Sequence, residues 1–228
     1  MKILITSGGT AEPIDAVRFI TNFSTGKTGA ALAEVFTQKG EEVILLRSRH
    51  AVSPTLPIDI VEFGSFADLD EKMRSILETT SVDAIVHLAA VSDFSVDHLL
   101  SGDQKVTTFD GKLDSEKSLT IHLKRNFKIL DRLKDYAKNT PLIIGFKLTK
   151  NADKRTVQDK IAKLFSNKQV DIVVHNDLSA ISEENHPAAI YREGDPDPIG
   201  NSRTKRALGE YLHHLIAEDY IRKNRTKI

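Results

Sequence analysis

Short apolar runs alternate along the chain with segments whose apolar residues recur at helical spacing. The runs predict buried parallel strands at 2–6, 42–46, 58–63, 83–88, 141–147 and 171–177. The amphipathic segments predict helices at 29–39, 65–77, 128–136, 154–165 and 204–222. Strands that alternate with helices form a parallel sheet with right-handed crossovers. We therefore expect an α/β protein with a Rossmann-like, doubly wound and mostly parallel sheet.

Four segments depart from this alternation. Residues 11–23 form a long loop without predicted structure of its own, and loops of that length are usually functional or disordered. Residues 95–118 are polar and predict a mobile flap or hairpin, followed by a strand at 119–123. A strand at 188–191 and the turn after it predict a hairpin, and the basic tail from 223 to 228 is expected to fray.

Composition narrows the class of protein. The 228 residues include 32 basic and 32 acidic side chains, so the sequence argues against a general nucleic-acid or membrane-surface binder. There is no cysteine, which excludes disulfides, thiolate metal sites and a cysteine nucleophile. No apolar run reaches the roughly 20 residues of a membrane span, and the first strand begins at Lys2 without a signal peptide before it. We expect one domain, 1–228, in a cytoplasmic protein.

The stretch 20–29 is the strongest candidate for a functional loop. It is polar, contains Gly26 and runs directly into a predicted helix, whose free N–H groups and positive dipole end suit a phosphate. It imitates the end of a P-loop, but Thr21 stands where that motif requires glycine, so we reject a P-loop. Gly8 and Asp93 follow predicted strands, and Asn22 lies in this loop. We expect all three at the carboxyl edge of the sheet, where such folds bind ligands.

Six motifs occur in the order of a known family and span nearly the whole chain. They are TSGGTAEPID (6–15), RFITNFSTGK (18–27), AAVSDF (89–94), GKL (111–113), GFKL (145–148) and VHND (174–177). With them the chain resembles the phosphopantothenate–cysteine ligases (phosphopantothenoylcysteine synthetases) of coenzyme A biosynthesis. The chain begins at the ligase motif, so the resemblance implies a stand-alone bacterial type without the flavin-dependent decarboxylase domain or its flavin.

The resemblance also implies the reaction. A nucleoside triphosphate activates the carboxylate of 4'-phosphopantothenate as an acyl-nucleotidyl anhydride, and the amine of L-cysteine then displaces the monophosphate. Both nucleophiles belong to substrates, so the protein must supply positioning and charge stabilisation. Magnesium is expected with the triphosphate, although the sequence shows no dedicated metal cage. A homodimer is expected from the family alone.

Site residues follow from the resemblance, residue by residue. Asn22 matches the asparagine that contacts the acyl-nucleotide, and Lys112 matches a flap lysine that neutralises the reacting phosphates; these are the predicted catalytic residues. Ser24, Thr25 and Gly26, with Asn22, are the predicted substrate and phosphate contacts. The predicted nucleotide contacts are Gly8, Gly9, Ala90, Asp93, Lys112, Lys128, Phe146, Lys163 and Lys168. Lys160 is the alternative to Lys163, and a solvated helix face explains either lysine equally well.

Two points stay open at this stage. The chain has Asn126-Phe127-Lys128 where the family often has Asn-Pro-Asp, and the stretch after Phe146 is not the common alanine-rich version. These positions line the nucleotide site in the family, so the choice of nucleotide is open. CTP is expected from the bacterial type, with ATP as the alternative. His50, His87, His122, His175 and His186 lack metal-ligand spacing and are interpreted as structural or surface residues.

Two other functions compete with the ligase. A nicotinamide-dependent reductase of the extended short-chain type is indicated by residues 86–90, but its glycine motif would lie too far beyond the first strand. No tyrosine of the chain has the lysine four residues later that such reductases need. A non-catalytic nucleotide-binding module is the third hypothesis, against which the presence of both Asn22 and Lys112 argues.

Overall fold

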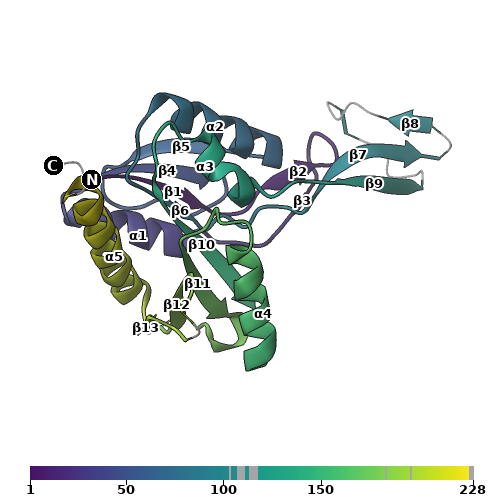
Figure 1. The fold of residues 1–228 in the computed structure, drawn as a ribbon. Helices are drawn as coiled ribbons and strands as arrows, with labels where there is room; N and C mark the ends of the chain where they lie inside the picture. Colours follow the sequence, from purple (N-terminus) through teal and green to yellow (C-terminus); the bar gives the residue numbers. More distant parts are fainter. Residues whose placement is uncertain (103, 107–110, 113–117, 183, 196, 226–228) are drawn as a thin grey trace.

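The apolar runs form an eight-stranded central sheet (Figure 1). This computed structural model describes residues 1–102, 104–106, 111–112, 118–182, 184–195 and 197–225. The strands of the sheet are β1 (Lys2–Ser7), β4 (Glu42–Ser48), β5 (Asp59–Phe63), β6 (Ala84–His87), β10 (Leu142–Thr149), β11 (Ile172–Asp177), β12 (Ala188–Arg192) and β13 (Gly200–Ser202). Their spatial order is β13-β12-β11-β10-β6-β1-β4-β5. The strands from β11 to β5 pair in parallel, whereas β12 and β13 form the predicted antiparallel hairpin.

The sheet has a topological switch point between β1 and β6. From β1 the chain proceeds outward through β4 and β5, and it then returns to the other side of β1 and proceeds through β6, β10 and β11. In open parallel sheets the crevice at such a point, outside the carboxyl ends of the strands, is the usual ligand site. The predicted Rossmann-like, doubly wound fold is confirmed.

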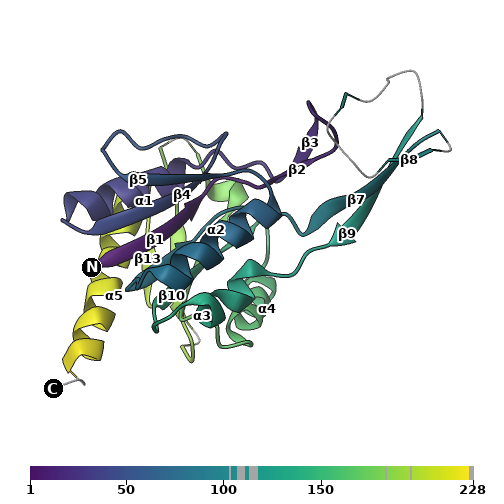
Figure 2. The same ribbon diagram turned by 90° about the horizontal axis from the view of Figure 1, so that it is seen from above.

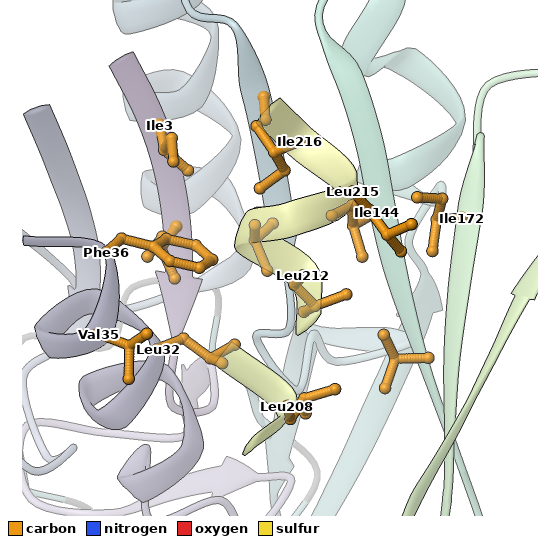
Figure 3. Close-up of a cluster of buried hydrophobic side chains, with 14 of the residues drawn as sticks. Ile3, Leu32, Val35, Phe36, Ile144, Ile172, Leu208, Leu212, Leu215 and Ile216 are labelled. Carbon is orange, nitrogen blue, oxygen red and sulfur yellow. The ribbon is translucent and has the colours of Figure 1, made fainter. Parts of the chain in front are cut away.

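Helices cover both faces of the sheet because the side chains of buried strands alternate between two apolar layers. The helices α1 (Lys27–Gln38) and α5 (Lys205–Arg225) cover one face, and α2 (Phe66–Thr79), α3 (Leu133–Tyr136) and α4 (Lys154–Phe165) cover the other. On β1, Ile3 and Ile5 belong to the first layer and Leu4 to the second. Figure 3 shows the first layer, where Phe36 of α1 and Leu212 of α5 lie over the sheet.

An antiparallel arm projects from this body (Figures 1 and 2). It consists of β7 (Phe94–Ser101), β8 (Gln104–Val106) and β9 (Leu119–Arg125). The predicted strand at 119–123 is therefore present, and the predicted flap begins with a strand of eight residues. Residues 103, 107–110 and 113–117 of the predicted flap lie outside the described residues.

Residues 11–23 were predicted to form a long loop without structure of its own. This prediction was wrong, because the segment contains the hairpin of β2 (Ala11–Pro13) and β3 (Phe19–Thr21). Glu12 explains why this segment is ordered. Its buried carboxylate accepts hydrogen bonds from the main-chain N of Phe66 at 2.8 Å and from Ser95 Oγ at 2.7 Å. It thereby ties the hairpin to the start of α2 and to the arm, a contact between distant residues that periodicity does not reveal.

Two helix boundaries also differ from prediction. The helix expected at 128–136 is divided into a 3-10 turn, η1 (Ile129–Arg132), and the short α3. The side chain of Gln169 accepts the main-chain N–H of Lys134 at 3.0 Å, which takes this donor from a continuous helical ladder. Helix α5 continues to Arg225, because Lys223 Nζ ion-pairs with Asp219 at 2.6 Å and donates to Thr140 O at 2.9 Å. Residues 226–228 of the tail predicted to fray lie outside the described residues.

Across the part of the chain that the structure describes, no helix combines the length and apolar character needed to cross a membrane.

Candidate functional site

A cleft of about 660 Å³ lies at the carboxyl edge of the sheet, at the switch point between β1 and β6. Its walls come from the loop after β1, the loop into α1, the ends of β6 and β10, and the connection from β11 to β12. The lining residues are Gly8, Phe23–Gly29, Leu88–Ala90, Phe146–Leu148, Asn176, Leu178, Ile181, Ser182, His186 and Lys205. Six of the predicted contacts are thus brought together in one cleft, namely Gly8, Ser24, Thr25, Gly26, Ala90 and Phe146.

The loop into α1 presents the start of that helix to the cleft. Gly26 is the N-cap with φ of 73°, a left-handed conformation that suits glycine, and as a glycine it offers no side-chain cap. Thr25 Oγ1 accepts the N–H of Lys27 at 3.4 Å. Ser7 Oγ donates to Gly26 O at 3.0 Å and Val52 N donates to Thr25 O at 2.9 Å, so both sides of the loop are held. The first N–H groups of a helix have no partner within the helix and carry its positive dipole end. This start suits an anion such as a phosphate.

Asn22 lies where the loop before α1 meets the loop after β6. Its Nδ2 atom donates to Val91 O at 3.1 Å. Gly9 forms an isolated parallel bridge with Ala90, and a Cβ atom on Gly9 would lie 2.4 Å from Asn22 O. The close approach of the Asn22 backbone therefore requires glycine at position 9.

The floor of the cleft is supported by a buried polar pair. Thr6 Oγ1 accepts the main-chain N–H of Ala89 at 3.1 Å and lies 3.0 Å from His87 Nδ1. Burial lowers the pKa of His87 to about 4, so the ring is neutral and Nδ1 can accept the Thr6 hydroxyl proton. His87 therefore has a structural role, because it fixes the Thr6 hydroxyl whose oxygen accepts the N–H of Ala89.

A group of lysines lies beside the cleft around Asp93. Lys147 lines the cleft, and its pKa is lowered first by burial and then by the charges of Lys160 and Lys128, with a smaller effect of Lys163 and an opposing effect of Asp93. Asp93 forms an exposed ion pair with Lys128. Lysines that depress one another's protonation favour an anion among them. Between the two helix lysines considered from the sequence, Lys160 has the stronger electrostatic effect on Lys147.

Lys168 lies away from the cleft. It occupies the turn between α4 and β11 with φ of 58°, at the edge where the parallel strands begin. Lys134 Nζ donates to Lys168 O at 2.8 Å, and Asp171 accepts the N–H of Ile143 near the start of β10. The cleft is at the opposite ends of these strands, so the structure does not bring Lys168 to it.

Lys112 is exposed and lies next to the turn of the β2–β3 hairpin. The main-chain O of its neighbour Gly111 accepts the N–H of Ala16 at 3.4 Å, in the turn of that hairpin. Lys112 does not line the cleft in this conformation.

Several cleft residues were missed as site candidates from the sequence, among them Lys147, His186 and Lys205. Lys147 belongs to the quoted GFKL motif and follows Phe146, so its place at a strand end was a usable signal. His186 and Lys205 lie in a loop and at the start of a distant helix, and no local pattern marks them. Among the described residues, no three His, Asp or Glu side chains are grouped so that they could hold a metal ion.

The comparisons with known proteins agree with this geometry. Residues 1–220 match the family described as the DNA/pantothenate metabolism flavoprotein C-terminal domain. The Coenzyme A biosynthesis bifunctional protein CoaBC of Thermococcus kodakarensis is 33% identical over 212 residues, which cover 92% of this chain and 49% of that protein. The chain spans less than half the length of the CoaBC proteins of Methanocaldococcus jannaschii, Thermococcus kodakarensis and Bacillus subtilis.

Solved structures share the whole fold. The DNA/pantothenate metabolism flavoprotein of Streptococcus pneumoniae has a TM-score of 0.84 and 28% identity, with 96% of this chain and 99% of that chain covered. The C-terminal domain of a Coenzyme A biosynthesis bifunctional protein CoaBC has a TM-score of 0.72 and 28% identity, with 98% and 96% covered. The match to residues 1–220 decides the family: the chain belongs to the DNA/pantothenate metabolism flavoprotein C-terminal domains, as its motifs had indicated.

Proposed function

We propose that the chain is a ligase of coenzyme A biosynthesis that joins 4'-phosphopantothenate to L-cysteine through an acyl-nucleotidyl intermediate. The observation that carries the proposal is the cleft at the switch point, where a helix start with a glycine N-cap, the Asn22 loop and Lys147 converge. Family membership and the CoaBC relatives support the same reaction.

In the first step a carboxylate oxygen of 4'-phosphopantothenate attacks the α-phosphorus of the nucleotide. The bond from that phosphorus to the bridging oxygen breaks, and pyrophosphate leaves with the electron pair. We assign the neutralisation of the phosphates to Lys147 and Lys160, to the helix start at Gly26, and to Lys112 on the arm. Fixed positive charge in a partly buried cleft stabilises the charge that develops on the leaving pyrophosphate.

In the second step the cysteine amine attacks the acyl carbon, and the nucleoside monophosphate leaves with its oxygen after the amine has lost a proton. Asn22 is assigned to the acyl oxygen. Its Nδ2 atom carries two hydrogens, of which one is directed to Val91 O, so one remains for the tetrahedral intermediate. A neutral amide adds no charge that would repel the phosphates.

CTP is the proposed nucleotide, with ATP as the alternative, and Phe146, Ala90, Asp93 and Lys128 are the proposed contacts to its nucleoside part. Magnesium is proposed to enter with the triphosphate, whose oxygens are the ligands it prefers. We further propose a homodimer, supported by large apolar side chains exposed on the arm, Phe94 at 49% and Leu123 at 48%, and by Val17 in the adjacent hairpin at 61%. Sedimentation equilibrium tests the dimer.

The test of the function is pyrophosphate release with 4'-phosphopantothenate, magnesium and either CTP or ATP, with and without L-cysteine. The ligase predicts pyrophosphate that depends on 4'-phosphopantothenate, and CMP or AMP that appears only after cysteine is added. No release with either nucleotide from folded protein would reject the ligase. A Lys147→Met variant that releases pyrophosphate at the unchanged rate would reject the assignment of Lys147.

The same protein preparation separates the two competing functions. Oxidation of NADH or NADPH by a carbonyl substrate would favour the reductase, whereas tight nucleotide binding without turnover would favour the binding module.

A further inference from the structure

His186 is a buried histidine in the wall of the cleft. It lies in the connection between β11 and β12, and its side chain is mostly buried, with the residue 8% exposed. Its Nε2 atom is 3.3 Å from Oγ1 of Thr28, in the first turn of α1. Its Nδ1 atom is buried and has no hydrogen-bond partner among the residues that the structure describes. Both Thr28 and His186 line the cleft.

The imidazole is held in place by its backbone. The N–H of His186 donates to Arg203 O at 2.8 Å, just before the start of α5. The next residue, Pro187, accepts a hydrogen bond at its carbonyl oxygen from Nδ2 of the buried Asn176, at 2.7 Å. The main chain that carries the imidazole is therefore held on both sides, and the ring that contacts Thr28 is buried.

A neutral imidazole carries its proton on one nitrogen, and here the two choices are unequal. Burial and the nearby Lys205 lower the pKa of His186 to about 4, so the ring is neutral at pH 7. A proton on Nδ1 would bury an N–H group without an acceptor, and such orphaned donors are rarer than under-satisfied acceptors. A proton on Nε2 instead gives Thr28 Oγ1 a donor.

The tautomer determines what Thr28 offers to the cleft. When Nε2–H donates to Oγ1, the hydroxyl proton of Thr28 is free to turn toward the cleft. When Nε2 accepts instead, the hydroxyl proton is consumed and the oxygen presents lone pairs, which repel an anion. The first arrangement adds a hydroxyl donor to the free N–H groups at the start of α1.

We propose that His186 is a positioning residue that makes the Thr28 hydroxyl a donor to a phosphoryl group bound at the start of α1. The proposal rests on the proposed function in one respect, namely that a phosphorylated substrate enters this cleft. The phosphoryl group belongs either to the nucleotide or to 4'-phosphopantothenate, and the experiment measures both.

The experiment is a double-mutant cycle read by isothermal titration calorimetry. The variants are Thr28→Val, His186→Leu and the double variant, titrated with magnesium–CTP, magnesium–ATP, 4'-phosphopantothenate and inorganic pyrophosphate. Thr28→Ser and His186→Gln keep the hydroxyl and a side-chain donor, and serve as rescue variants. Thr37→Val is the matched control, because Thr37 is on the same helix and its buried Oγ1 has no partner among the described residues.

For at least one ligand we expect Thr28→Val to raise Kd about tenfold, the loss of one hydrogen bond to a charged group. His186→Leu should raise the same Kd by a smaller factor, because the Thr28 hydroxyl remains but is no longer oriented. The double variant should bind no more than about twofold more weakly than Thr28→Val, because His186 acts only through the Thr28 hydroxyl. Thr28→Ser and His186→Gln should stay close to the wild type, as should Thr37→Val. Effects that multiply in the double variant, or an unchanged Kd for every ligand in His186→Leu, would overturn the proposal.

Two further readouts separate a positioning role from loss of fold and from failure of the ligase function. Nitrogen-15 spectra of the ring should show the proton of His186 on Nε2, and a proton on Nδ1 would overturn the proposal. Coupled losses of pyrophosphate affinity support the positioning role even if the protein fails to release pyrophosphate in the ligase assay. Wild-type protein that binds none of the four ligands would overturn both proposals.

Discussion

Asn22 donates a hydrogen bond from its side-chain Nδ2 atom to the main-chain oxygen of Val91, over 3.1 Å. The two residues are 69 positions apart, and the bond joins the loop before α1 to the loop after β6. Because Gly9 lets the Asn22 backbone approach the end of β1, three chain segments meet at this point. The geometry of the proposed reaction centre therefore depends on contacts that are made within the protein before any substrate is bound.

Replacement of Asn22 by alanine should slow the second chemical step more than the first. We expect pyrophosphate release to fall only a few-fold, and formation of the cysteine adduct to fall about 100-fold, as for the loss of one donor to an oxyanion. Single-turnover assays that follow pyrophosphate and the nucleoside monophosphate separately measure the two steps. Equal losses in both would contradict the assignment of Asn22.

The control for this variant is Asn139→Ala. Asn139 Nδ2 makes the same kind of bond, to Val82 O at 2.8 Å, just before β6 begins and so away from the cleft. It should lower stability to a similar degree while both chemical steps keep the wild-type rate.

Replacement of Lys147 by methionine should weaken nucleotide binding and stabilise the unliganded protein. Burial and the charges of Lys160 and Lys128 lower the pKa of Lys147, so at neutral pH its charge is unfavourable in the folded protein. The unfolded chain holds this proton more tightly, so removal of the charge should raise Tm. The triphosphate loses a partner, and we expect Kd for CTP to rise about tenfold, equivalent to about 1.4 kcal/mol.

Lys154→Met is the control, because Lys154 is exposed at the start of α4 and its ammonium group is 3.8 Å from the exposed Asp197. It should leave both Tm and Kd for CTP nearly unchanged. A Lys147→Met protein with lower Tm and unchanged Kd would show that Lys147 supports the fold rather than the ligand.

Replacement of Gly9 by alanine should destabilise the protein and impair the reaction together. The new Cβ atom would lie 2.4 Å from Asn22 O, a backbone atom that cannot move without the loop. We expect a loss of about 1–3 kcal/mol in the free energy of unfolding, typical of overpacking, measured by denaturant titration. Gly64→Ala places its Cβ atom 3.7 Å from Asp68 Oδ2, an ordinary contact, and should cost much less. Similar losses in the two variants would remove the close approach at Gly9 as the cause.

Stability should fall as the pH is lowered from about 6.5 toward 4. Burial lowers the pKa of His87 to about 4, and that of His186 is lowered to a similar value, so the unfolded chain binds protons that the folded protein excludes. The stability is complete above the ordinary histidine pKa of 6.5 and is lost progressively below it. A shift of this size corresponds to about 3 kcal/mol for His87 when fully expressed.

Urea unfolding at pH 7.5, 6.0 and 5.0 measures this dependence, in a range above the ordinary pKa of carboxylates. The variant His87→Gln should be less stable at pH 7.5 and should lose less stability between pH 7.5 and 5.0 than the wild type. An identical pH dependence in the variant would mean that His87 is not the group that takes up the proton.

The loop from Phe23 to Gly26 was predictable as a wall of the cleft because its signal is local. Polar residues and a glycine that directly precede an amphipathic helix describe a helix start with free N–H groups, whatever the rest of the fold does. Ala90 and Phe146 were predictable for a related reason, since they follow or end apolar runs and parallel strands bring such ends to one edge. Assignments of side chains that do not line the cleft, such as Lys112, stay predictions.

The lysines of α4 mark the limit of this reasoning. The resemblance to the family did not decide between Lys160 and Lys163, and it favoured Lys168. In the structure Lys168 lies at the edge where the strands begin, because a helix between two parallel strands returns from one edge to the other. Lys160 is instead close enough to the cleft to affect Lys147.

The sequence by itself determined the order of the strands and most of the helices of the central sheet, its Rossmann-like class and the family, because periodicity and contiguous motifs depend on neighbouring residues. Only the tertiary structure decided which distant groups meet. Glu12 caps the start of α2 across 54 positions, and His186 reaches Thr28 across 158. Such contacts depend on how the layers pack and on which buried polar atoms must be satisfied, and neither is written in the local pattern of the chain.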